Sequence, residues 1–168
     1  MRYYFAPMEG ITDAPYRKVH HSFFPGLDAY YMPFRSPTIH RSLTHKEDRE
    51  LPFAETESFV AVPQILTKVA EDFLWAAQVC HDRGYNEVNL NVGCPSGTVV
   101  SKGKGSGMLR DVDALDRFLD AIFEASPLPI SVKTRLGFDE PEEFPAILEI
   151  FNRYPIIELT IHPRVRKQ

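Results

Sequence analysis

Short runs of apolar and β-branched residues recur along the chain, and most are nearly continuous instead of alternating with polar residues. The six runs are residues 3–8, 29–34, 59–66, 87–93, 128–135 and 156–163. Continuous apolar runs of this length are typical of strands that are covered on both faces, as in a parallel sheet. The pattern therefore predicts six buried strands.

Helical periodicity occupies several of the intervals between these runs. In residues 112–125 the apolar side chains recur every three or four positions and form one face. Residues 68–83 carry a similar stripe, and Cys80 lies on it, so we expect Cys80 to be a core residue. Further helices are predicted over residues 141–153 and, more weakly, 13–22.

Two segments show no helical or strand pattern. Residues 35–58 are polar and irregular, which predicts a long loop. Residues 103–107 read GKGSG, and because the spacing of a phosphate-binding P-loop is absent, we expect a flexible loop there.

The alternation of strands and helices predicts right-handed crossovers, a parallel sheet and an α/β fold. Two architectures fit: a doubly wound open sheet, or part of a (β/α)8 TIM barrel. The doubly wound fold favours a glycine fingerprint after the first strand, and residues 6–15 lack one. A whole barrel needs roughly 250 residues. We therefore expect residues 1–168 to form an incomplete barrel with about six of its eight βα units.

The composition is that of a globular domain and not of a strongly basic nucleic-acid-binding protein. The chain has 168 residues, of which 43% are hydrophobic and 25% charged, as expected for one soluble globular core. The net charge of −4 argues against nucleic-acid binding by overall positive charge, although it leaves room for a local basic groove.

The number of cysteines and the hydropathy of the chain predict a cytoplasmic protein. The two cysteines, Cys80 and Cys94, provide neither a disulfide framework nor metal-ligand spacing, which favours a reducing environment and predicts no metal site. No signal peptide and no membrane-spanning run is recognisable, so we expect a cytoplasmic protein with no membrane partner.

Polar and ionisable residues follow the predicted strands where each strand ends. In a barrel these ends converge on one mouth, where active sites form. In chain order, the first three strand ends carry Pro7 and Met8, Phe34 and Arg35, and Gln64. The last three carry Asn89, Asn91 and Cys94, then Lys133 and Arg135, then His162 and Arg164.

Each of these residues alone has an ordinary structural explanation. Lys133 and Arg135 suit a strand that reaches solvent, and Gln64 or His162 can satisfy backbone groups. Asn89 and Asn91 alternate, so they share one face and need partners if that face is buried.

Together, however, these residues indicate a site. They lack the carboxylate pair of a glycosidase, the serine elbow of a hydrolase and a metal-ligand cluster. A lysine and a histidine among neutral donors would suit an anionic cofactor such as a flavin phosphate.

Five motifs resemble the tRNA-dihydrouridine synthase family, in its order and at its spacing. They are APMEGITDAPYR, PQIL, VNLNVGCPSGTVVSKGKGSGML, VKTRLG and TIHPR. The first begins at residue 6 and the last ends at residue 164, so the resemblance extends over almost the whole chain. The resemblance implies an FMN enzyme on a (β/α)8 barrel, followed by a helical domain that helps to hold tRNA. It also implies that NADPH reduces the flavin, which then reduces specific uridines in tRNA to 5,6-dihydrouridine.

The resemblance also assigns roles to individual residues. Cys94 matches the cysteine that donates a proton to the uridine. Residues that match FMN contacts are Pro7, Met8, Gln64, Lys133 and His162. Asn91, Arg135 and Arg35 match substrate contacts near the flavin, in the uridine pocket and toward the tRNA, respectively.

Length is the one departure from the family pattern, because the last two strands and the helical domain are absent. We therefore expect the 168-residue chain to bind FMN poorly, to be inactive by itself and to associate through exposed sheet edges. Two alternatives remain open: an FMN enzyme that acts on a free pyrimidine, and a non-catalytic truncated domain.

Overall fold

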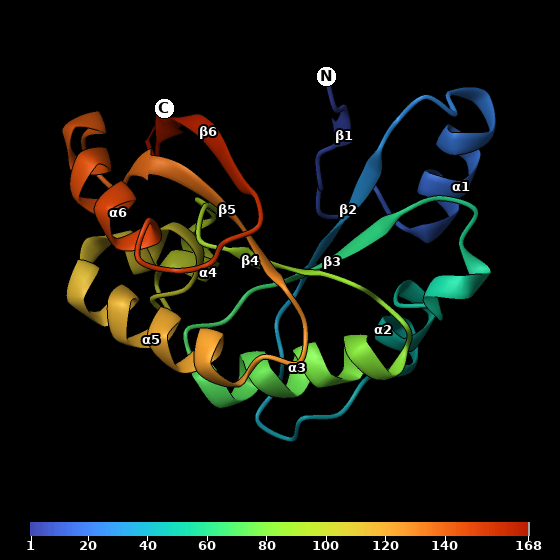
Figure 1. The fold of residues 1–168 in the computed structure, drawn as a ribbon, viewed down its shortest axis with the longest axis horizontal. Helices are drawn as coiled ribbons and strands as arrows, with labels where there is room; N and C mark the ends of the chain where they lie inside the picture. Colours follow the sequence, from blue (N-terminus) through green and yellow to red (C-terminus); the bar gives the residue numbers. More distant parts are fainter. Residues whose placement is uncertain (168) are drawn as a thin grey trace.

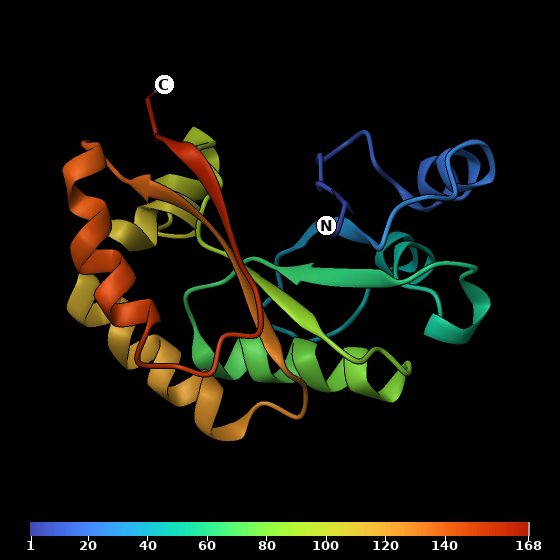
Figure 2. The same ribbon diagram turned by 45° about the horizontal axis from the view of Figure 1, so that its top comes forward.

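The strands form one curled parallel sheet. The structure, a computed structural model, describes residues 1–167. Its strands, in the spatial order β1 to β6, are β1 (Tyr4–Phe5), β2 (Ala29–Arg35), β3 (Ala61–Ile65), β4 (Val88–Asn91), β5 (Ile130–Gly137) and β6 (Leu159–Val165). All neighbouring strands pair in parallel. The sheet curls so that β1 and β6 stand on opposite sides of its opening (Figures 1 and 2). This half-barrel confirms the incomplete TIM-barrel fold and excludes the flat doubly wound sheet.

The helices lie between the strands and cover the outer face of the sheet. They are α1 (Ala14–Phe23), α2 (His45–Glu50), α3 (Ala70–Asp82), α4 (Gly97–Val100), α5 (Val112–Ala125) and α6 (Phe144–Phe151). Short 3-10 helices form η1 (Ala54–Thr56), η2 (Gly105–Arg110) and η3 (Pro141–Glu143). Among residues 1–167, none of these helices has the length and apolar character needed to cross a membrane.

The apolar core lies between the sheet and helices α3, α5 and α6. The apolar faces of these helices bury Phe73, Leu119 and Ile147 against strand residues such as Leu90 and Val132. Removing this much apolar surface from water is the main driving force for folding. Cys80 belongs to the same cluster and is only 2% exposed, which confirms the prediction that it is a core residue.

Two predictions from the sequence are wrong and one is refined. Residues 35–58 contain α2 and η1, because Thr44 and Glu47 form a reciprocal capping box that starts α2. The helix predicted over 141–153 is present, but its first turn is the 3-10 helix η3 and α6 ends at Phe151. Residues 103–107 are not a free loop, since Gly105 and Ser106 are buried in η2.

Candidate active site

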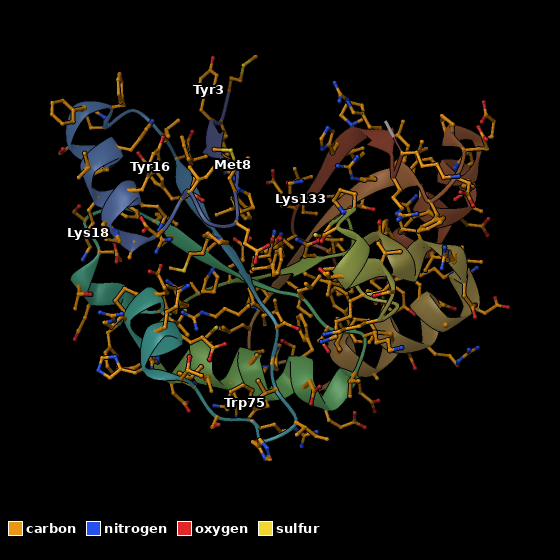
Figure 3. The ribbon with its side chains drawn as sticks, turned by 180° about the vertical axis from the view of Figure 1, so that it is seen from behind. Tyr3, Met8, Tyr16, Lys18, Trp75 and Lys133 are labelled. Atoms are coloured by element: carbon orange, nitrogen blue, oxygen red, sulfur yellow. The ribbon has the colours of Figure 1, made fainter. Side chains whose placement is uncertain are left out.

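A cavity of about 250 Å³ lies at the carboxyl ends of the strands. Seven of the nine site residues predicted from the sequence line it, namely Pro7, Gln64, Asn91, Cys94, Lys133, Arg135 and His162. Strand register explains part of this grouping, because Asn91 pairs with Lys133 and Arg135 pairs with His162 on the adjacent strand. Figure 3 shows Lys133 between the two arms of the sheet.

Below the cavity, three side-chain amides form a buried hydrogen-bonded chain. Asn91 Nδ2 donates to Gln64 Oε1 at 2.7 Å, and Gln64 Nε2 donates to Asn89 Oδ1 at 2.8 Å. All three residues are at most 7% exposed. Asn89 and Asn91 therefore do share one buried face and have the partners that burial requires.

The chain of hydrogen bonds continues to the opposite end of the half-barrel. Asn89 Nδ2 donates to Ser131 Oγ at 2.8 Å, and Ser131 Oγ donates to Glu87 Oε1 at 2.5 Å. Tyr31 also donates to this carboxylate, at 3.3 Å. Burial raises the pKa of Glu87, and the two hydroxyl donors oppose that rise. Every amide donor in the chain points toward Glu87, so each amide has one fixed orientation.

Both the backbone N–H and the backbone carbonyl of Cys94 form hydrogen bonds. The backbone N–H of Cys94 donates to Asn91 Oδ1 at 2.9 Å, while its carbonyl accepts from the backbone N and from Oγ of Ser106, both at 3.0 Å. Gly105 packs against the same carbonyl, where a Cβ atom would approach within 2.8 Å. This close contact explains why glycine is needed next to Ser106. The cysteine is thus presented on a fixed loop.

Arg135 links the Cys94 loop to the end of β6. Its Nε donates to the carbonyl of Gly93 at 2.8 Å, and its Nη1 donates to the carbonyl of Val165 at 3.0 Å. Burial lowers the pKa of this guanidinium, and the side chain is only 8% exposed. Its placement in the cavity wall lets Arg135 orient the residue that precedes Cys94.

Lys133 and His162 are two titratable side chains in the cavity wall, and the pKa of each is lowered. Among residues 1–167, Lys133 has no salt-bridge partner, and burial followed by the positive charge of Arg135 lowers its pKa. Burial, Arg135, Lys133 and Arg164 likewise lower the pKa of His162. A half-buried ammonium without a counter-ion is suited to an anionic ligand.

Met8 and Arg35 do not line the cavity. Met8 is 44% exposed and lies on the β1 side of the opening (Figure 3), where Thr12 Oγ1 accepts from its backbone N–H at 2.9 Å. Arg35 lies between the sheet and the helices near Trp75, and its guanidinium donates to the carbonyl of Glu47.

Several residues of the site carry no prediction from the sequence. Phe34, although at a predicted strand end, was assigned no role, and neither were the lining residues Glu9 and Pro33. Ser131 and Glu87 complete the amide chain below the cavity. Alternation is the signal that could have found them, because Ser131 shares a face with Lys133 and Glu87 shares one with Asn89. Their hydrogen-bond partners, however, depend on the pairing of strands far apart in sequence.

Comparisons with known proteins agree with this arrangement. The family model described as dihydrouridine synthase matches residues 4–168. A probable tRNA-dihydrouridine synthase of Staphylococcus aureus (strain COL) is 34% identical over 165 residues, which cover 97% of this chain and 49% of that protein. The tRNA-dihydrouridine synthase B of Xanthomonas campestris pv. campestris is 30% identical over 164 residues, covering 97% of this chain and 48% of that protein.

The chain spans about half the length of the curated relatives that it matches. The family match nevertheless extends over nearly all of its residues and includes every residue that lines the cavity. The chain therefore belongs to the dihydrouridine synthase family.

Proposed function

We propose that the protein reduces specific uridines in tRNA to 5,6-dihydrouridine, with FMN as its cofactor and NADPH as the reductant. The observation that carries this proposal is the single cavity in which Cys94, Lys133 and His162 meet the buried amides of Gln64 and Asn91. The names of the relatives supply the substrate class. Reduced FMN, when bound, would supply the hydride for C6 of the uridine.

The residues present fit a flavin. Lys133 offers a half-buried positive charge that no carboxylate among residues 1–167 neutralises, which suits the electron-rich end of a reduced isoalloxazine ring. Gln64 offers a polar side chain from β3, and His162 a ring from β6. Pro7 closes the β1 side of the cavity, and Met8 continues the same loop toward solvent. The four residues that line the cavity would hold the cofactor there, and Met8, just outside the cavity, would contact it from the β1 side.

Cys94 is the proposed proton donor. Addition of hydride to C6 of a uracil ring leaves negative charge at C5 and O4, so an acid must deliver a proton to C5. The Sγ atom of Cys94 is the acidic group at the end of β4, and the hydrogen bonds of its backbone to Asn91 and Ser106 fix its position. Holding an acid in place before the reaction reduces the entropic cost of the transition state.

The substrate has to leave its stack to reach this cavity, as with other enzymes that act on nucleobases. Asn91 and Arg135 border the space in which the uracil would lie. Arg35, which lies outside the cavity, would act on the tRNA by holding α2 and the loop before it through Glu47.

The proposal includes the place of this chain in a longer enzyme. Residues 1–168 would be the N-terminal portion of an FMN-binding TIM barrel, and the remaining strands and a helical tRNA-binding domain would lie outside it. Alone, the chain would then bind FMN poorly and be inactive. The enzyme would act in the cytoplasm.

A comparison of electron acceptors tests the proposal. The native gene product is loaded with FMN, reduced with NADPH without oxygen, and then mixed with unmodified tRNA, free uracil or orotate. We expect tRNA to reoxidise the flavin and to gain dihydrouridine. Reoxidation by the free pyrimidines but not by tRNA would instead favour an enzyme of pyrimidine metabolism. No reduction of any acceptor would favour a non-catalytic domain.

A further inference from the structure

Three lysines gather on one side of the cavity mouth. Lys68 follows β3, while Lys102 and Lys104 belong to the segment between β4 and α5. Lys104 Nζ donates to Ser36 Oγ at 2.7 Å, so the loops that follow β2 and β4 meet across the end of β3. An added Cβ at Gly103 would lie 3.1 Å from Lys68 Nζ, which places Lys68 against the same loop.

These lysines have almost no negative charge around them. Within the described residues 1–167, none of the three forms a salt bridge. The carboxylate that attracts Lys104, that of Asp72, is already paired with Arg41 at 3.2 Å. Burial, and then Lys102 and Lys68, lower the pKa of Lys104. Like charges held together without counter-ions are unfavourable, and an anion bound between them would relieve the repulsion.

The cluster adjoins the Cys94 loop directly. Gly105, the residue after Lys104, is so close to Cys94 that an added Cβ would lie 3.0 Å from the Cys94 Cβ. The lysines therefore lie beside the loop that carries Cys94, at the carboxyl ends of β2 and β3.

The neighbouring part of the mouth is of mixed charge. A groove of about 560 Å³ between α1 and α2 is lined by four carboxylates and three basic side chains, namely Glu9, Asp13, Glu47, Glu50, Arg17, Arg35 and Lys46. A polyanion that approaches the mouth is therefore attracted more strongly on the lysine side, where the positive charges are not balanced by carboxylates.

We propose that Lys68, Lys102 and Lys104 bind backbone phosphates of RNA next to the nucleotide whose base enters the cavity. This inference rests on the proposed function, because a base inserted beside Cys94 leaves its flanking phosphates at the rim. Beyond the cavity that would take the base, the protein would have a separate phosphate-binding surface, formed by residues that do not line the cavity. Contacts to phosphate position a nucleic acid without reading its sequence.

The test is the salt dependence of tRNA binding by the native gene product. The variant K68Q/K102Q/K104Q is compared with K46Q/R117Q/R153Q, which loses the same charge from α2, from α5 and from the residues that follow α6. Affinity is measured between about 50 and 200 mM salt. We expect the slope of log affinity against log salt to become shallower by about two units in the lysine variant. The control variant should keep the slope of the wild type.

Further measurements keep the test decisive. Thermal melting and flavin reduction by NADPH should be unchanged in the lysine variant, and K104R should bind tRNA like the wild type. If the triple variant does not fold, Lys102→Gln alone should reduce the slope by about one unit, because Lys102 is exposed and its side chain makes no hydrogen bond within residues 1–167.

The outcomes separate this inference from the proposed function. An unchanged slope in the lysine variant, or a loss confined to NADPH binding, overturns the phosphate surface even if dihydrouridine still forms. Lysine-dependent tRNA binding without any dihydrouridine formation supports the surface and instead refutes the proposed reaction.

Discussion

The side-chain oxygen of Asn91 accepts a hydrogen bond from the backbone N–H of Cys94 at 2.9 Å, just beyond the end of β4. The same oxygen accepts from the backbone N–H of Gly93 at 3.0 Å, while Nδ2 donates down to Gln64. One asparagine thus connects the buried amide chain to the loop that carries the thiol. A shift of the amide chain would therefore be transmitted to Cys94.

Asn91→Ala should destabilise the protein by about 2–3 kcal/mol, because it leaves the buried Gln64 oxygen and two backbone N–H groups without partners. Denaturant unfolding followed by the fluorescence of Trp75 measures this loss. Asn86→Ala is a matched control at an exposed position and should change stability by less than about 0.5 kcal/mol. Equal effects of the two substitutions would show that the amide chain is not structurally important.

Gly105→Ala should disrupt the Cys94 loop. Gly105 has a φ of +57°, and an added Cβ would approach the Cys94 carbonyl oxygen to 2.8 Å and Val99 Cγ1 to 2.9 Å. Left-handed backbone alone costs a non-glycine residue about 1–2 kcal/mol, and the steric contacts add to that. Gly97→Ala is the control, since a Cβ there meets nothing within 4 Å. Thermal melting of both variants checks the prediction, which is wrong if Gly105→Ala melts at the temperature of Gly97→Ala.

The stability provided by neutral His162 should decline at low pH. Its pKa in the folded protein is lowered from 6.5 by burial and by Arg135, Lys133 and Arg164. As the pH falls below about 6.5 the unfolded chain takes up the proton first, so this contribution is present above that pH and is lost below it. The advantage of the wild type over His162→Gln in urea unfolding should therefore shrink between about pH 7 and pH 5. An NMR titration midpoint of His162 at or above 6.5 would contradict the assignment.

The 168-residue chain should self-associate. Within the described residues, β1 and β6 each pair on one side only, and unpaired strand edges are templates for association. Helix α1 and the residue after it also expose Val19, Phe23 and Phe24, which are 58%, 74% and 63% accessible. Sedimentation velocity should show mass rising with concentration, and less so in F23S/F24S. A stable monomer at high concentration would disprove this prediction.

The sequence was sufficient to predict the half-barrel and most of the cavity wall. Continuous apolar runs mark buried parallel strands, and the polar residues that interrupt them near the carboxyl ends converge for topological reasons. This is why Gln64, Cys94 and Lys133, although far apart along the chain, were predicted for one site.

Arg35 shows a limit of predicting a site from residues near strand ends. The pairing of β2 with β3 shifts register between Tyr31 and Phe34. Phe34 therefore lines the cavity, whereas Arg35 points toward the helices. Irregularities of this kind depend on the partner strand and leave no clear signal in a single sequence.

The GKGSG segment shows a second limit. Its glycines suggested flexibility, but Gly105 is glycine because the Cys94 loop packs against it. The capping box of α2, by contrast, was readable from the spacing of Thr44 and Glu47.

The central claim is that Cys94 donates the proton in uridine reduction. Its most direct test is mass spectrometry of tRNA nucleosides from cells that lack the gene and carry the wild type, Cys94→Ala or Cys80→Ala. Cys80 is a buried core thiol whose pKa is raised to about 12 by burial, so it serves as the control. We predict dihydrouridine at its usual sites with the wild type and Cys80→Ala, and a rate lower by roughly 100-fold or more with Cys94→Ala, although NADPH still reduces the flavin. Undiminished dihydrouridine in the Cys94→Ala cells would contradict this account.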